Sequence, residues 1–311
     1  MKLNFYEESL LHMEPRFVDP FTDFGFKKLF GEEPNKELLQ DFLNELLVDR
    51  EGQIVELTYL KNEQLDSSPD DRKAFFDLYC KNEHGERFIV ELQKVKQRHF
   101  KDRTIYYSTF PIREQATRAE WDYALKAVYL IAILDFEFTE HRQDRQKYRH
   151  DIQLMDTQTH QVFYDKLTYI YLEMPKFDKP VEALTNRYEK WLYVIKNLGR
   201  LEEKPVQLQE RIFNRLFDAA EVASYDLEQR LRYNETLKIR RDYNNVMNTA
   251  RYEGRQEGRQ EGRQEGRQEA QRSIIQNGLQ LGLTTGALAE LTGLPIDRIE
   301  AIITTLNSSA D

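Results

Sequence analysis

The sequence contains one cysteine, Cys80, and this scarcity removes two kinds of site. A single thiol forms no internal disulfide and cannot supply the several thiolates of a cysteine zinc site. The six histidines show no HExxH or similarly close ligand spacing, so we expect no histidine zinc site either. Walker A, GxGxxG and GxSxG motifs are also missing, which argues against nucleotide hydrolysis, dinucleotide binding and a serine-hydrolase elbow.

Long apolar runs and an excess of basic charge are missing as well. No run approaches the roughly 20 apolar residues of a membrane span, and residues 1–14 have neither the apolar core nor the cleavage site of a signal peptide. We therefore expect a cytoplasmic protein with no membrane contact. The 45 Lys and Arg face 54 Asp and Glu, a net charge of −9. This balance disfavours indiscriminate coating of nucleic acid but allows a local basic site.

Hydrophobic residues make up 40% of the 311, enough for a sizeable core in one large domain with a small appendage or in two modest domains. Their spacing predicts a loose arm (1–20), two helices (22–31 and 34–47), a strand (53–60), a strand pair (73–94) and a helix (99–118). A strand buried on both faces (126–136) comes next, then two or three more strands (152–155, 161–164 and 168–174), and finally helices (186–252).

The first two predicted helices carry recognisable ends and polar accents. Thr22 or Asp23 can cap the first helix, and Gly31 is its expected end. Three polar residues near these helices have two interpretations, a metal or water contact or a plain cap or surface group: Asp23, Asn44 and Glu45.

The stretch around which the chain is organised is 73–94, KAFFDLYCKNEHGERFIVELQK, which predicts two strands and a tight turn. If Gly85 takes the left-handed position of a three-residue turn, Asp77 lies directly opposite Glu91. Like charges whose Cβ atoms are roughly 5 Å apart across a strand pair destabilise it unless they are neutralised. A divalent cation would neutralise them, and Gln93 shares the face of Glu91 because side chains alternate along a strand.

A basic segment follows directly. Residues 94–103, KVKQRHFKDR, carry five Lys and Arg and one His against one acid, directly after the acid pair, and this fits a local basic site. A solvated helix face is an equal alternative. Arg103 and Tyr107 are one turn apart on the same face of the predicted helix, a spacing that fits a surface arginine beside a packed tyrosine.

Residues 253–269 repeat EGRQ four times. Each interior glycine costs a helix about 1 kcal/mol relative to alanine, and every i,i+4 pair is like-charged. An isolated helix is therefore marginal, so we expect a flexible tether or a helix formed against a closely approaching partner. Further on, Ala289, Gly293 and Ile299 have helix-turn-helix spacing, but Arg298 lies among acids, which favours a protein-contacting tail over an operator reader.

An acid on one strand followed by Glu-x-Gln on the next resembles the D…(D/E)xK motif of the PD-(D/E)xK nucleases, with Gln93 where a lysine usually stands. Together with DFGFKKLFG at 23–31 and the spacing to FFDLYC and IVELQ, roughly residues 15–270 resemble the Rpn-type recombination-promoting nucleases, also described as PD-(D/E)xK family transposases. The resemblance implies an α/β fold with a restriction-endonuclease-like core, in which helices flank a mixed central sheet, and a helical C-terminal extension. The expected domains are an N-terminal arm, 1–14, a nuclease-like domain, 15–245, an EGRQ-repeat linker or helix, 246–272, and a small helix-turn-helix-like tail, 273–311.

The function that this resemblance implies is metal-dependent cleavage of double-stranded DNA, associated with recombination or a mobile element. Asp77, Glu91 and the backbone carbonyl of Leu92 would hold Mg²⁺ or another divalent cation such as Mn²⁺, and Gln93 would orient the attacking water. The residues expected to seat the DNA backbone are Lys94, Lys96, Arg98 and Arg103.

Glutamine lacks the charge of the usual lysine, so either Lys94 or Lys96 supplies it or the enzyme is slow. Two alternatives remain. One is a DNA-associated or self-associating protein of mobile-element origin whose nuclease centre has decayed. The other is a purely structural interaction protein built on the C-terminal helices and the repeat. The expected partners are double-stranded DNA and, through the C-terminal helices, a second copy of the chain.

Overall fold

A computed structural model describes residues 15–50, 52–61, 63–64, 74–116, 122–141 and 143–308. The expected arm of residues 1–14 lies outside them. The chain divides into two compact units, Met1–Lys238 and Ile239–Asp311. Within the described residues, no helix combines the length and the apolar character needed to cross a membrane.

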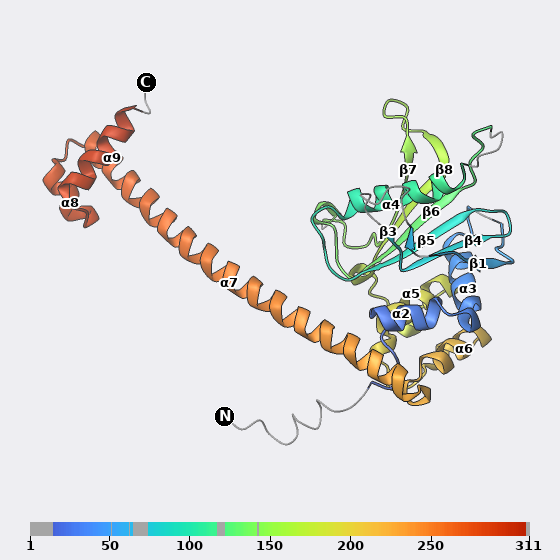
Figure 1. Ribbon diagram of the computed structural model, residues 1–311. Helices are drawn as coiled ribbons and strands as arrows, with labels where there is room; N and C mark the ends of the chain where they lie inside the picture. Colours follow the sequence, from blue (N-terminus) through green and yellow to red (C-terminus); the bar gives the residue numbers. More distant parts are fainter. Residues whose placement is uncertain are drawn as a thin grey trace, which may run out of the picture. The chain divides into compact units, whose positions relative to one another are not determined.

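The first unit is built on a six-stranded mixed sheet of order β1-β4-β5-β6-β8-β7 (Figure 1). The inner strands β5, β6 and β8 run parallel, while β1, β4 and β7 are antiparallel to their neighbours. The strands are β1 (Leu57–Tyr59), β4 (Leu78–Asn82), β5 (Arg87–Gln93), β6 (Val128–Leu134), β7 (Arg149–Met155) and β8 (Val162–Glu173). A separate two-stranded sheet pairs β2 (Glu63–Gln64) with β3 (Ala74–Phe75).

The central position of β6 was predicted from its apolar run and is confirmed. All seven of its residues are buried, and β5 and β8 pair with it on its two sides. The two strands expected at 161–164 and 168–174 are one continuous strand, β8 (Val162–Glu173). The exposed Asp165 and Lys166 interrupt the apolar pattern, but the backbone continues to pair with β7 through irregularities near Leu154.

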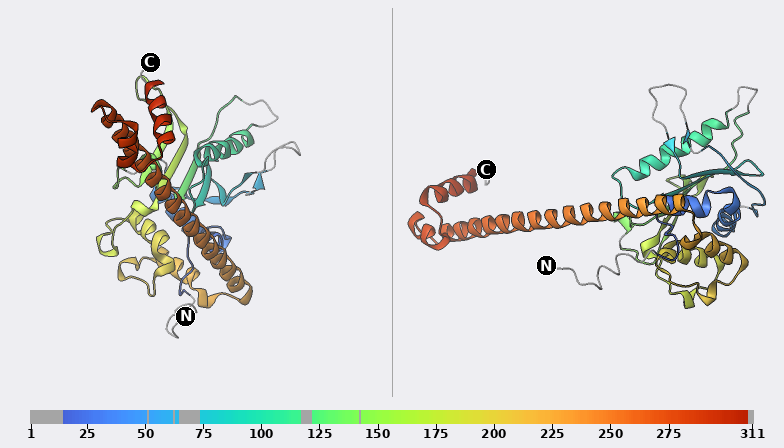
Figure 2. Two further views of the ribbon diagram at one scale, coloured as in Figure 1. Left: turned by 90° about the vertical axis from the view of Figure 1, so that its left-hand side faces the viewer. Right: turned by 60° about the horizontal axis from the view of Figure 1, so that its bottom comes forward.

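Helices cover both faces of the sheet (Figures 1 and 2). α4 (Phe100–Glu114) lies on one face, while α2 (Asp23–Phe30), α3 (Lys36–Leu46), α5 (Arg187–Asn197) and α6 (Arg211–Ala220) form a layer on the other. In this layer Trp191 is fully buried, with ring centroids of Phe30, Phe42 and Phe213 at 5.1–6.0 Å. Short 3₁₀ helices connect the elements: Glu33–Asn35, Thr139–His141, Met174–Lys176, Val181–Ala183, Leu198–Arg200, Val206–Leu208 and Val222–Ser224.

The start of α2 follows the sequence prediction. Thr22 is the N-cap, its hydroxyl accepting from the Gly25 amide at 2.9 Å, and Gly31 is the C-cap. Gly25 itself is required, since a Cβ there would lie 2.1 Å from the Asp19 carbonyl oxygen. These contacts fix which residues α2 turns toward the sheet.

The prediction of a loose arm as far as residue 20 is wrong for its last part. Phe17 and Val18 are buried, and a short backbone pairing holds them to the end of α6. The Val18 amide donates to the Ala220 carbonyl at 2.8 Å, and the Val222 amide donates to the Arg16 carbonyl at 2.9 Å. Residues 16–18 thus form an extended segment that pairs with the chain at the end of α6.

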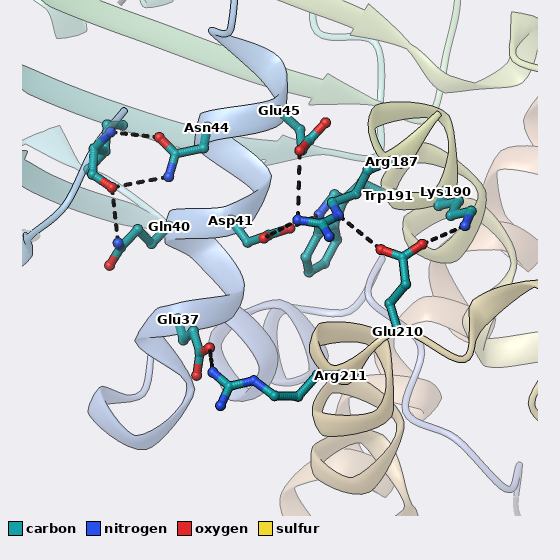
Figure 3. Close-up of polar contacts among 11 residues, drawn as sticks. Glu37, Gln40, Asp41, Asn44, Glu45, Arg187, Lys190, Trp191, Glu210 and Arg211 are labelled. Atoms are coloured by element: carbon teal, nitrogen blue, oxygen red, sulfur yellow. Dashed lines mark hydrogen bonds and ion pairs between the residues drawn. The ribbon is translucent and has the colours of Figure 1, made fainter. Parts of the chain in front are cut away.

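Polar side chains on α3 bind neighbouring parts of the first unit (Figure 3). Asn44 binds both backbone groups of Ile54, accepting from its amide at 2.7 Å and donating to its carbonyl at 3.1 Å. Glu45 lies 4.0 Å from Arg187, which also pairs with Asp41 at 3.2 Å. The contacts of Asn44 and Glu45 therefore support a structural role, which is to hold α3 against its neighbours, for both residues.

α7 (Leu227–Gln280) continues from the first unit into the second and includes the whole EGRQ repeat. Helix was one of the two forms expected for the repeat, and its side chains are exposed. In the second unit the last turns of α7 pack against α8 (Thr285–Thr292) and α9 (Ile296–Ser308) through Ile275, Leu288 and Ile299. Gly293 ends α8 with a φ of 68°, the turn position predicted for it.

Candidate active site

The hairpin of β4 and β5 has the register predicted from its turn. Leu78 pairs with Val90, which sets Asp77 beside Glu91 at the end of the strand pair. Gly85 has a φ of +81°, and its amide donates to the Asn82 carbonyl at 3.1 Å. A left-handed residue at this point is what a three-residue loop needs, so the glycine in the turn fixes which acids meet.

The two carboxylates are joined through the backbone. The Asp77 amide donates to Glu91 Oε1 at 3.2 Å, and the Leu92 amide donates to Asp77 Oδ2 at 2.8 Å. Glu91 is 6% exposed and Asp77 is half-buried. Each acid is thus held by the strand that carries the other.

This arrangement is electrostatically costly for two ionised acids. Burial, and then the nearby Asp77 carboxylate, raises the pKa of Glu91 to about 8. Burial also raises the pKa of Asp77, while the hydrogen bond from the Leu92 amide opposes the rise. Without a cation, the pair retains a proton near neutral pH, as expected of a site whose charge is balanced by something that it binds.

The donor set fits a hard divalent cation. Within the described residues, there is no cluster of three or more His, Cys, Asp or Glu side chains able to hold a metal. Mg²⁺, however, commonly uses one or two carboxylates and keeps several waters. The Leu92 amide points toward Asp77, and in an extended strand the carbonyl of a residue points to the same edge as its amide. Two carboxylates and the Leu92 carbonyl can therefore face one point.

Gln93 has protein partners at both ends of its amide. It is 9% exposed, its Nε2 donates to the Val95 carbonyl at 2.7 Å, and its Oε1 accepts from Nη2 of Arg103. Arg103 also donates through Nη1 to Gln97 Oε1 at 2.6 Å. Its guanidinium carbon lies 5.6 Å from the Tyr107 ring centroid, so the predicted pair on α4 does form a contact.

α2 contributes two charges beside the acids. Lys27 forms an ion pair with Asp23 at 2.8 Å. The Lys27 charge lowers the pKa of both Asp77 and Glu91, whereas Asp23 raises that of Asp77. Asp23 was predicted as a candidate, whereas Lys27 was not, although both belong to DFGFKKLFG and are four residues apart, the spacing at which helical side chains meet.

The basic segment does not act as one unit. Lys94 is half-buried, and this burial lowers its pKa while the acids Asp23, Asp135 and Asp77 oppose the shift. Lys96 is exposed and donates to the Thr139 hydroxyl. Arg98 is exposed too. Of the four residues predicted to seat DNA, only Arg103 has a recorded hydrogen bond to a residue of the acid motif, so the described contacts distinguish it from the others.

The comparison with protein families matches most of the chain and lies within the residues, roughly 15–270, over which the resemblance was predicted. Residues 20–250 match the model of the PD-(D/E)XK nuclease family transposases. The chain belongs to this family. The expected fold class is confirmed, since the family's region contains the mixed sheet with its flanking helices and a helical region follows it. Membership supports a function of the nuclease or transposase type. No curated protein and no solved structure matches the chain.

Proposed function

We propose that this PD-(D/E)XK family member is a metal-dependent endonuclease that hydrolyses phosphodiester bonds of double-stranded DNA, in recombination or in a mobile element. The observation that carries the proposal is the acid pair. Asp77 and Glu91 face each other at a strand end, with raised pKa values, directly before a basic segment. A family of nuclease transposases supplies the matching chemistry.

Asp77, Glu91 and the Leu92 carbonyl would hold the cation, Mg²⁺ or Mn²⁺. When bound, such a cation polarises the phosphate, lowers the pKa of a water and stabilises the leaving oxygen. In the hydrolysis, the water oxygen forms the new bond to phosphorus as the bond to the leaving sugar oxygen breaks, and a proton of the water passes to that oxygen. The acids must be ionised to hold the cation, which makes the proton held by Glu91 a competitor of metal binding.

The basic side chains at 94–103 would seat the DNA backbone without reading its sequence, because contacts to phosphate carry no sequence information. A second candidate function rests on a specific observation, the neutral Gln93 at the position of the motif's lysine. On that basis the chain would be a DNA-associated or self-associating protein whose cleavage centre has decayed.

Nicking of supercoiled plasmid tests the proposal. The proteins are wild type and Asp77→Asn with Glu91→Gln, each assayed with Mg²⁺ and with EDTA. Glu257→Gln with Glu261→Gln, two exposed acids of the repeat, is the matched control. We expect nicking that needs Mg²⁺, persists in the control and disappears in the acid variant. Equal nicking by all proteins would assign it to a contaminant or another site, and none by any would favour the decayed centre.

A further inference from the structure

The position of the motif's lysine is occupied by an uncharged side chain whose oxygen is bonded to a cation. Gln93 Oε1 accepts a hydrogen bond from Arg103 of α4. A guanidinium therefore stands beside the end of the side chain at the lysine position. The positive charge that residue 93 lacks is supplied from another element of the fold.

Arg103 is held in place on several sides. Its second terminal nitrogen donates to Gln97 at 2.6 Å, and its guanidinium carbon lies 5.0 Å from the ring centroid of Phe100 and 5.6 Å from that of Tyr107. The side chain is half-buried, so it stays partly open to a ligand. A cation fixed by two hydrogen bonds and two aromatic faces needs little reorganisation when a charge develops next to it.

The charge of Arg103 also reaches the acids, because it lowers the pKa of both Asp77 and Glu91. Lys94 follows the end of β5, and Asp23, Asp135 and Asp77 raise its pKa against the lowering effect of burial. Lys27 reaches both acids from α2, but its ion pair with Asp23 at 2.8 Å offsets its charge. Arg103 is thus the cation with a direct contact to the motif.

We propose that Arg103 is the catalytic cation of this site and that Gln93 is the residue that positions it, the two together replacing the motif's lysine. This inference rests on the proposed nuclease function. Arg103 would contact the phosphate oxygen that gains negative charge during hydrolysis. Because arginine keeps its proton at any physiological pH, it would stabilise charge without acting as a base.

The test compares wild type, Arg103→Ala, Gln93→Lys with Arg103→Ala, and Arg113→Ala. Arg113 is the matched control, since it lies on the same helix and stacks on Phe110 at 5.6 Å, outside the site. Each protein is assayed for the initial rate of plasmid nicking in Mg²⁺ and for DNA affinity in Ca²⁺. Loss of one preorganised charge donor predicts a rate about 100-fold lower for Arg103→Ala. DNA affinity should fall by less than about tenfold, because Arg103 is one of several basic side chains at 94–103 that seat the backbone.

Rescue separates a catalytic charge from a structural contact. The double variant places a lysine at the motif position. We expect it to nick at least about tenfold faster than Arg103→Ala, because the lysine charge lowers part of the activation barrier that loss of Arg103 raises. A double variant no faster than Arg103→Ala would overturn the proposal. So would a loss of DNA affinity as large as the loss of rate, which would make Arg103 a phosphate seat only.

A titration with Mn²⁺ keeps the inference distinct from the function on which it rests. Removing a cation near two carboxylates strengthens their attraction for another cation, so we expect Arg103→Ala to bind Mn²⁺ several-fold more tightly than wild type. An unchanged affinity would overturn the charge assignment even in a protein that cleaves. A wild type that binds Mn²⁺ but does not nick would instead overturn the proposed function.

Discussion

Replacing Glu91 with glutamine should stabilise the metal-free protein, although it should abolish cleavage. Glutamine is nearly the same size, and its oxygen can still accept the hydrogen bond from the Asp77 amide that Glu91 accepts at 3.2 Å. What the substitution removes is a buried negative charge beside a second acid. The metal-free fold bears the cost of that charge whenever Glu91 is ionised.

The size and the sign of the effect follow from the pKa of Glu91. Its usual value of 4.5 rises to about 8 in the folded protein. Between these values the folded state holds a proton that the unfolded state has released, so stability falls as pH rises through this window. At about 1.4 kcal/mol per pKa unit, the full loss is roughly 5 kcal/mol, of which roughly 4 kcal/mol is reached by pH 8, where folded Glu91 is half ionised. Relaxation and water entry reduce burial penalties, so we expect the variant to gain about 2 kcal/mol.

Thermal unfolding in EDTA at pH 5, 6.5 and 8 measures this difference. For a unit of this size, about 2 kcal/mol corresponds to roughly 4–8 °C in Tm, and the gain should vanish toward pH 5. Added Mn²⁺ should raise the Tm of wild type, since a ligand that binds only the folded state stabilises it. It should do less for the variant. Glu257→Gln, an exposed acid with the same substitution, is the control and should change little.

Two results would refute this reasoning. A Tm for Glu91→Gln that equals that of wild type at every pH would mean that the acid pair carries no electrostatic cost in the folded protein. A variant less stable at pH 8 would mean that ionised Glu91 is favourable even without a cation. Either result would remove the argument that the pair is built around a bound positive charge.

Three further predictions concern the fold. Lys176→Met should lower the free energy of unfolding by about 3 kcal/mol, because it leaves the fully buried Glu173 without the ammonium now 2.5 Å away. Chemical denaturation measures this loss, and adding Glu173→Gln should recover part of it. Thr22→Ala removes the cap of α2 and should cost about 1 kcal/mol in the same assay, and an unchanged midpoint would contradict the capping role. Gly258→Ala with Gly262→Ala should stabilise α7 by about 1 kcal/mol per site, since an added Cβ meets nothing within 4 Å; the helical circular dichroism signal should persist to higher temperature, and earlier melting would indicate a partner that needs the glycines.

Local rules were sufficient where one residue sets the geometry of many. Gly85 decided the turn, the turn decided the register, and the register brought Asp77 to Glu91. The buried strand β6 was equally predictable, because a continuous apolar run of strand length is typical of a strand covered on both faces. The cap at Thr22 follows from the same kind of short-range rule.

Contacts between distant segments were not predictable in this way. Residues 16–18 were predicted to be loose because their partners, the carbonyl of Ala220 and the amide of Val222, lie roughly 200 residues away in the chain. Lys27 looked like one more exposed lysine on α2 until the fold placed that helix against the acid pair. Both cases depend on tertiary packing, which a single sequence does not specify residue by residue.

The same limit explains the role given to Gln93. In the sequence Gln93 lacks the charge of the motif's lysine, and Lys94 or Lys96 was therefore predicted to supply it. In the fold the positive charge beside Gln93 belongs to Arg103, ten residues further along, because the first turn of α4 brings Arg103 back to the strand end. A lysine reaching its metal site along its own strand and a glutamine holding an arginine from a helix place positive charge in the same region. Under the proposal that Arg103 is the catalytic cation, the motif position sets the region where positive charge is needed, and the surrounding fold sets which residue supplies it.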